Sequence, residues 1–150
     1  AAPLKGNLLT NEHTTPALPA LIDEIPILAV AGAFTDGSLE VREAEELRAK
    51  ESDRIEAMAT EMRKVGIEVE VFEDGFRIEG NPNRTLHAPA EPLQAYHDHR
   101  IAMALTILNK IATPDQWPAN AWPLDGKDWA KVSFPNFYDV LTELDRSLIS

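Results

Sequence analysis

The chain has 150 residues, of which 44% are hydrophobic, and this is enough material for one hydrophobic core. Its formal charge of −11 argues against non-specific binding to nucleic acid, and the absence of Cys excludes disulfides, thiolate nucleophiles and thiolate metal ligands. No apolar run approaches the ~20 residues that span a bilayer, and no signal-like segment opens the sequence, so we expect a cytoplasmic protein without membrane contact.

The first half of the chain predicts four elements in succession. Residues 23–35 are apolar nearly all round and follow an acidic start, which indicates a buried helix. Residues 39–41 alternate as a short strand, and residues 52–66 predict an amphipathic helix with a Ser or Asp cap and a terminal Gly. Alternation on both sides of an Asp-Gly turn predicts a β-hairpin over residues 67–78.

The second half follows the same plan, which predicts two α/β units at approximately residues 1–80 and 81–150. A nearly all-apolar helix is expected over residues 98–111, a strand-like stretch follows, and an amphipathic helix is expected over residues 134–148. The Pro- and Asn-rich residues 81–92 indicate a surface connection between the units. Two unrelated α/β segments are the alternative.

Residues 113–129 contain all three Trp residues together with three Pro residues. The Pro residues indicate turns. The indole rings would either stack on a ligand or cover the edge of the core, and we favour the second interpretation.

The two predicted helix starts have an unusual charge pattern. A helix N-terminus carries roughly half a positive charge and favours Asp or Glu. Nevertheless, Lys50 and Arg54 flank one start, and His99 and Arg100 lie in the first turn of the other. Backbone N–H groups and guanidinium groups suit phosphate and carboxylate, so a shared anionic ligand is one interpretation. Surface ion pairs are the other, and the acidic residues available for them are Glu51, Asp53 and Asp98.

Carboxylates and histidines near these helix starts suggest further chemistry. Asp23 and Glu51 would act as base and acid if their surroundings kept one ionised and the other protonated. Asp23 would equally serve as an N-cap of the buried helix. His97 and His99 point in different directions and no third ligand completes a set, so we expect no metal. Neither Gly-rich phosphate-binding motif occurs, so a nucleotide-binding fold has no support.

Four sequence motifs resemble those of the 5-enolpyruvylshikimate-3-phosphate synthases. In chain order they are IDEIP at residues 22–26, LRAKESDRI at 47–55, DHRIAMA at 98–104 and SFPNF at 133–137. Their order and approximate spacing agree with the family, and together they cover nearly the whole chain.

The resemblance implies an enzyme of the shikimate pathway, which leads to the aromatic amino acids. Such an enzyme transfers the enolpyruvyl group of phosphoenolpyruvate to the 5-hydroxyl of shikimate 3-phosphate and releases phosphate without a metal or cofactor. By motif, Asp23 matches the residue that contacts the shikimate and takes its hydroxyl proton. Glu51 matches the acid that protonates the methylene carbon of phosphoenolpyruvate. The resemblance therefore assigns the catalytic roles to these two carboxylates.

The resemblance also assigns substrate-binding residues. Lys50 matches a ligand of the shikimate phosphate group. Arg54 and Arg100 match the guanidinium groups that hold phosphoenolpyruvate, with His99 supporting beside them. Both substrates are polyanions, as the anionic-ligand interpretation of the helix starts requires.

The sequence departs from the family pattern at three places. Val132 stands where many members carry Lys, and Lys131 is a candidate replacement. Glu46 stands where some members have an Asn that contacts the shikimate. The stretch with the Trp and Pro residues is longer than usual.

The family has an α/β fold, an inside-out α/β barrel of two lobes that each contain three βαβαββ units. The resemblance implies that this chain is the C-terminal part of one lobe, about two of the six units, and that the N-terminal lobe is absent from the sequence. We therefore expect the chain alone to be inactive. The alternatives are a non-catalytic domain that binds a partner chain or a ligand, and a UDP-N-acetylglucosamine enolpyruvyl transferase of the same fold and chemistry.

Overall fold

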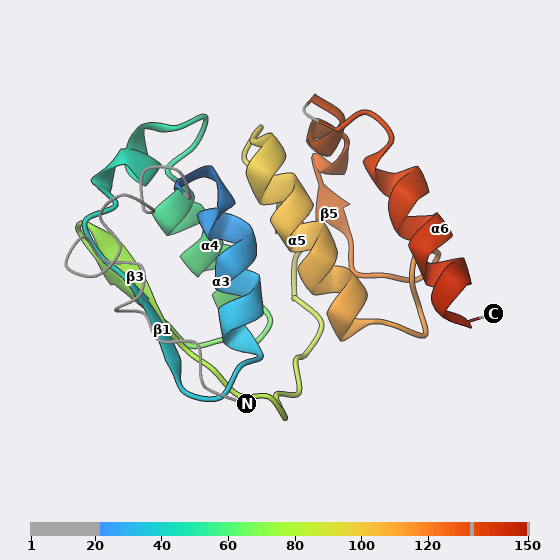
Figure 1. The fold of residues 1–150 in the computed structure, drawn as a ribbon, viewed down its shortest axis with the longest axis horizontal. Coiled ribbons are helices and arrows are strands. Elements are labelled where there is room, and N and C mark those ends of the chain that lie inside the picture. The colour runs from blue at the N-terminus through green and yellow to red at the C-terminus, as the bar shows by residue number, and fades with distance from the viewer. Residues whose placement is uncertain (1–21, 133, 150) are drawn as a thin grey trace.

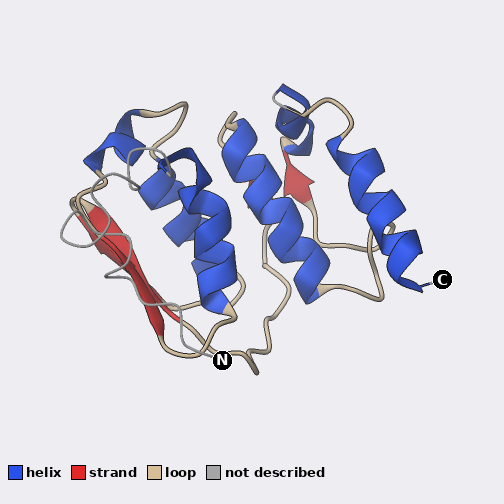
Figure 2. Ribbon diagram, viewed as in Figure 1, coloured by secondary structure: helices blue, strands red, loops and turns tan. Residues whose placement is uncertain are grey.

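The computed structural model describes residues 22–132 and 134–149, which alternate between helices and strands (Figures 1 and 2). The helices are α3 (Ile25–Ala33), α4 (Arg54–Arg63), α5 (His99–Ala112) and α6 (Phe137–Ile149), and the short 3₁₀ helices are η2 (Ile22–Glu24), η3 (Glu45–Ala49) and η4 (Lys127–Val132). The strands are β1 (Ser38–Val41), β2 (Val69–Phe72), β3 (Gly75–Glu79), β4 (Leu93–Gln94) and β5 (Leu124–Asp125).

A three-stranded antiparallel sheet with the order β1-β3-β2 forms one side of the molecule. The predicted hairpin is confirmed as β2 and β3, which pair from Val69–Ile78 to Phe72–Gly75. Strand β1 pairs with the other edge of β3. Gly75 is required at the start of β3, where this strand lies close to β1, because a Cβ there would lie 1.7 Å from the carbonyl oxygen of Val41.

Helices α3 and α4 cover the inner face of the sheet, and α5 lies beside α3 (Figure 1). One hydrophobic cluster joins the two halves of the chain, because side chains of α5, including Leu105, pack in the same core as Ile25 of α3 and Ile78 of β3. Gly32 lets the backbone of α3 approach β1, since a Cβ there would lie 2.9 Å from the Cβ of Leu39. The predicted buried position of the first helix is therefore confirmed.

The second half is built on α5. Strands β4 and β5, which lie before and after this helix, form a two-stranded parallel sheet. A smaller cluster of buried Ala95, Ala102 and Ala130 is covered by partly buried Phe137 and Tyr138. Helix α6 thus packs beside α5 and η4 at the far edge of the molecule from the three-stranded sheet (Figure 1).

Several element boundaries differ from the sequence-based expectation. The first helix is a 3₁₀ turn followed by α3. Helix α3 ends at Ala33, because the next residue, Phe34, leaves the helical conformation. The last helix begins at Phe137, after Pro135, and not at residue 134; Ser133, its expected start, lies outside the described residues. Residues 81–92 contain no helix or strand, which agrees with the predicted connection. Within the described part of the chain, no helix is long and apolar enough to cross a membrane.

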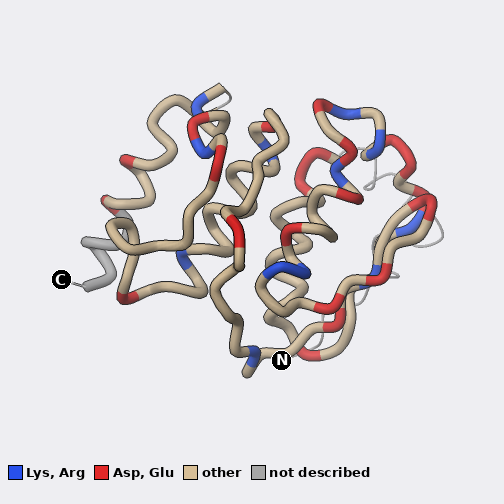
Figure 3. Tube along the Cα trace, turned by 180° about the vertical axis from the view of Figure 1, so that it is seen from behind, with Lys and Arg blue, Asp and Glu red and all other residues tan. Residues whose placement is uncertain are grey.

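Acidic residues are spread over both halves of the chain, and one group of them lies around the three-stranded sheet and η3 (Figure 3). Glu68, Glu70 and Glu73 are exposed around β2, and Glu45 and Glu46 are exposed on η3. These residues therefore form a solvated acidic face.

Candidate active site

The starts of α4 and α5 meet at an ion pair between Arg54 and Asp98. Arg54 is 2% exposed and Asp98 is fully buried. The Nε and Nη2 atoms of Arg54 donate to the two carboxylate oxygens of Asp98 over 2.9 and 3.2 Å. This two-point geometry is a strong form of charge-assisted hydrogen bonding, and it fixes both helix starts relative to one another.

Asp98 is also the N-cap of α5. Its carboxylate accepts from the backbone N–H groups of Arg100 and Ile101, over 2.9 and 3.4 Å, and from the Ser52 hydroxyl over 2.7 Å. Burial acts to raise the pKa of Asp98, but the hydrogen bonds from Arg54 and Ser52 outweigh it and lower the pKa overall. Asp98 is therefore a fully ionised, fully hydrogen-bonded anchor.

Two more carboxylates surround the outer edge of the Arg54 guanidinium. Nη1 of Arg54 donates to Asp23 over 3.0 Å, and Nη2 donates to Glu51 over 2.7 Å. The side chains of Asp23 and Glu51 are 47% and 51% exposed, so both are accessible to solvent, unlike Asp98. Lys50 lies 3.6 Å from the same oxygen of Asp23. Four of the residues selected from the sequence thus form one cluster.

The charges of this cluster reinforce one another. Burial acts to raise the pKa of Asp23, but Lys50 and Arg54 outweigh it and lower the pKa overall. Burial acts to lower the pKa of Arg54, and the carboxylates around it, first Asp98, raise it overall. Asp23 is therefore ionised at neutral pH.

Arg100 reaches the cluster from the first turn of α5. Its Nη1 donates to Glu24 of η2 over 3.3 Å, and its Nε is buried without a hydrogen-bond partner among the described residues. Asp23, Glu24 and Arg100 line a cavity of about 200 Å³ together with apolar side chains of α3, α5 and α6. His99 is half-buried in the same first turn.

The two interpretations of the helix-start cations are resolved differently at each residue. Arg54 is neutralised by carboxylates, but in a buried network and not in a surface pair. Asp53, an expected partner, instead caps α4 by accepting from the Glu56 N–H and pairs with Arg48. The N-cap prediction for Asp23 is wrong, because Glu24 holds that position and Asp23 lies within η2.

The sequence indicated Asp98 as the start of a buried helix and as a candidate partner for surface ion pairs, and it indicated Ser52 only as a helix cap. Neither residue was expected in a buried cluster with Arg54. Asp98 lies 44 residues from Arg54, and no local pattern reports a contact of that range. The available signal was the coincidence of an acidic cap with a basic residue at each of two helix starts.

Histidines do not form a metal site in the part of the chain that the structure describes. Within residues 22–132 and 134–149, no group of three His, Cys, Asp or Glu residues is placed to hold a metal ion. His97 stacks on Trp129, with ring centroids 5.2 Å apart. His87 is exposed, and His13 lies outside the described residues.

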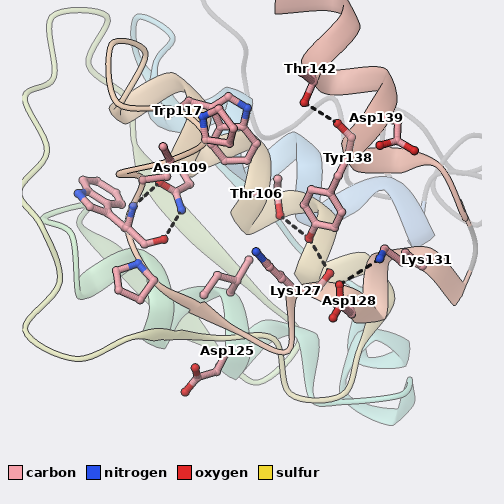
Figure 4. A pocket seen from close by; sticks show the side chains of 16 residues that line it. Thr106, Asn109, Trp117, Asp125, Lys127, Asp128, Lys131, Tyr138, Asp139 and Thr142 are labelled. Carbon is pink, nitrogen blue, oxygen red and sulfur yellow. Dashed lines mark hydrogen bonds and ion pairs between the residues drawn. The ribbon is translucent and has the colours of Figure 1, made fainter.

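A larger cavity of about 590 Å³ lies in the second half and shares no residue with the cluster (Figure 4). It is lined by Trp117 and Trp122 and by side chains of α5, η4 and α6. Trp122 packs partly buried against the main core, and its backbone exchanges hydrogen bonds with the Asn109 amide over 2.7 and 3.0 Å. The core-edge prediction is confirmed for Trp122.

Lys131, the candidate replacement for a family Lys, lies on this larger cavity. Its Nζ is 3.4 Å from Asp128, and Figure 4 shows the pair at the η4 side. Val132 is 65% exposed. The structure therefore places the Lys131 ammonium with Asp128 and not with Asp23 or Arg54.

A three-stranded antiparallel sheet that packs against α3 and α4, with the cationic starts of α4 and α5 in contact, agrees with the enolpyruvyl transferase class of α/β folds. Solved structures agree: an EPSP synthase from Acinetobacter baumannii superimposes with a TM-score of 0.71 at 31% identity, over 85% of this chain and 28% of that chain. The family model described as EPSP synthase (3-phosphoshikimate 1-carboxyvinyltransferase) matches residues 9–141, and the chain belongs to this family.

Relatives named 3-phosphoshikimate 1-carboxyvinyltransferase match most of this chain. The protein of Leptospira interrogans is 40% identical over 143 residues, and that of Aquifex aeolicus is 45% identical over 127 residues. These matches cover 91% and 85% of this chain but 31% and 27% of the relatives. The chain thus spans about a third of the length of the curated relatives.

Proposed function

We propose that this chain forms the C-terminal part of an enzyme that transfers the enolpyruvyl group of phosphoenolpyruvate to the 5-hydroxyl of shikimate 3-phosphate and releases phosphate. The observation that carries this proposal is the cluster itself, in which Asp23 and Glu51 flank the Arg54 guanidinium in a chain of the EPSP synthase family. The reaction belongs to aromatic amino-acid biosynthesis, and we place it in the cytoplasm.

The two exposed carboxylates suit the two proton transfers of this reaction. Asp23 is ionised and takes the proton of the 5-hydroxyl, whose oxygen then attacks C2 of phosphoenolpyruvate. Glu51 donates a proton to C3, so that the double bond becomes a single bond. Loss of phosphate from C2 and of a proton from C3 restores the double bond in the product.

The cations supply the complementary charge. Arg54 and Arg100 bind the phosphate and carboxylate groups of phosphoenolpyruvate, with His99 beside them, and Lys50 binds the phosphate of shikimate 3-phosphate. Lys50, Arg54 and Arg100 already hold carboxylates in the free chain, so their side chains are oriented toward anions before any substrate arrives. This preorganisation lowers the cost of ordering them in the complex.

A second part of the protein completes the site in this proposal. The matched relatives are about three times as long as this chain. The cations of the cluster all lie at the starts of two helices, α4 and α5. We therefore assign the remaining substrate contacts to an N-terminal lobe, and we assign this chain two units at approximately residues 1–80 and 81–150.

A chimera tests this function. The N-terminal portion of the Aquifex aeolicus relative is joined to this chain, and phosphate release is measured with both substrates. We expect turnover by the chimera and none by the 150-residue chain alone. A folded chimera that binds neither substrate would instead support a non-catalytic domain. Arg77→Lys on β3, which keeps the charge at an exposed position, is the control for Arg54→Lys, which removes the planar fork.

A further inference from the structure

The buried face of α4 carries two charged residues that contact the same segment of the second half. Arg54 and Glu61 are seven positions apart, so they lie on one side of the helix, nearly two turns from each other. Both are buried, Arg54 at 2% and Glu61 at 0% exposure. Arg54 binds Asp98, and Glu61 binds the residues just before it.

The hydrogen bonds of Glu61 join α4 to the segment that precedes α5. Its Oε1 accepts from the backbone N–H of Gln94 over 2.7 Å and from Lys64 over 2.8 Å, and its Oε2 accepts from the Tyr96 hydroxyl over 2.7 Å. A buried carboxylate is costly unless such donors satisfy it. Two of its three donors lie on the segment that leads to Asp98.

This segment has an unusual backbone. Tyr96 and His97 both have a positive φ, 57° and 54°, although neither is Gly. Such conformations persist only where the surroundings determine them. The turn is closed by the Asp98 N–H, which donates to the Ala95 carbonyl over 3.0 Å, and the Tyr96 hydroxyl ties it to Glu61.

We propose that Glu61 is a positioning residue for the active site: through Gln94 and Tyr96 it holds the strained turn that places Asp98, and Asp98 in turn orients Arg54 and the first turn of α5. Helix α4 therefore binds the segment from Gln94 to Asp98 through two side chains, Arg54 and Glu61. This assignment rests on the proposed function only for its effect on substrates, because its effect on Arg54 does not require a substrate.

The exchange of the Arg54 Nε proton with water reports on this arrangement directly. In the ¹⁵N-labelled chain, the signal is identified by its loss in Arg54→Lys. We expect Glu61→Gln and Tyr96→Phe each to speed its exchange about tenfold, because the hydrogen bond to Asp98 opens more often. Glu70→Gln, which makes the same charge change at an exposed position on β2, leaves the exchange unchanged.

A general loss of stability has a different signature from loss of positioning. The Ala44 amide donates to the Asp74 carbonyl over 2.8 Å beside the three-stranded sheet, so its exchange reports on opening of the first half away from the segment before α5. The proposal requires that Ala44 keep its exchange rate in both variants while Arg54 loses protection. Equal acceleration at both sites, or unchanged Arg54 exchange in a folded Glu61→Gln chain, overturns it.

Tyr96→Phe decides the matter if Glu61→Gln does not fold, because it removes one hydroxyl from a side chain that is 40% exposed. In the chimera, both variants are expected to raise the KM for phosphoenolpyruvate about tenfold while kcat changes less. If the unsubstituted chimera shows no turnover, the proposed function fails, whereas faster exchange at Arg54 still supports the positioning role.

Discussion

Arg54 and Asp98 form the most deeply buried ion pair among the described residues, with side-chain exposures of 2% and 0%. Their two hydrogen bonds connect helices that begin 45 positions apart, at Arg54 and His99. An isolated charge in such a place is far less stable than a paired one, because neither water nor another donor replaces the lost partner.

Removal of the Asp98 carboxylate should therefore destabilise the fold. We expect Asp98→Ala to lower the free energy of unfolding by about 3–5 kcal/mol, measured by urea denaturation. Asp128→Ala, which removes an exposed partner of Lys131, should change it by less than about 1 kcal/mol. Equal losses in the two variants would contradict the role given to the buried pair.

Stability should depend on pH through the same carboxylate. The pKa of Asp98 in the folded chain is below the ordinary value of 3.8, so the folded state binds fewer protons than the unfolded state at acidic pH. The stabilisation from Asp98 is therefore complete above pH 3.8 and is lost as the pH falls through the folded-state pKa. Denaturation curves should show that the free energy of unfolding falls as the pH drops below 4. The fall should be smaller in Asp98→Asn. If the free energy of unfolding fell equally with pH in both proteins, Asp98 would not be the source of the pH dependence.

Proton transfer should depend on the two exposed carboxylates. In the chimera, Asp23→Asn and Glu51→Gln are each expected to lower kcat by about 10²–10⁴, because each removes one general acid or base. Glu68→Gln, at an exposed position before β2, is the matched control. Steady-state phosphate release gives kcat, and calorimetry checks that shikimate 3-phosphate still binds. Full activity in Asp23→Asn would remove this residue from the mechanism.

The close approach of β1 to the start of β3 should tolerate only Gly at position 75. A methyl group there would overlap the carbonyl of Val41, so Gly75→Ala must displace one strand. We expect it to lower the free energy of unfolding by about 2 kcal/mol or more. Arg77→Ala, an exposed change on the same strand, should stay within about 0.5 kcal/mol. A thermal melt of the two variants compares them, and a Gly75→Ala chain as stable as Arg77→Ala would show that the strands can separate there.

Local sequence signals accounted for the elements and for the β2–β3 hairpin, but not for the pairing of β1 with β3. Asp53 and Gly66 mark the ends of the helical pattern around α4, because capping and termination act within a few residues. The pairing of β1 with β3 depends on the close approach of Gly75 to Val41, which no pattern of alternation reports.

The sequence predicted most of the residues of the candidate site but not the contacts between them. Asp23, Lys50, Glu51 and Arg54 were selected by motif and charge, and they do lie together. Asp98 was named only as a partner for surface ion pairs. Its buried, two-point contact with Arg54 was not expected, because that contact forms only when α4 and α5 pack.

The carboxylate that each guanidinium holds in the free chain has a consequence for ligand entry. Glu51 occupies one edge of Arg54, and Glu24 occupies Arg100. An incoming phosphate that uses the same N–H groups must exchange places with these side chains, so binding is an ion exchange within the protein.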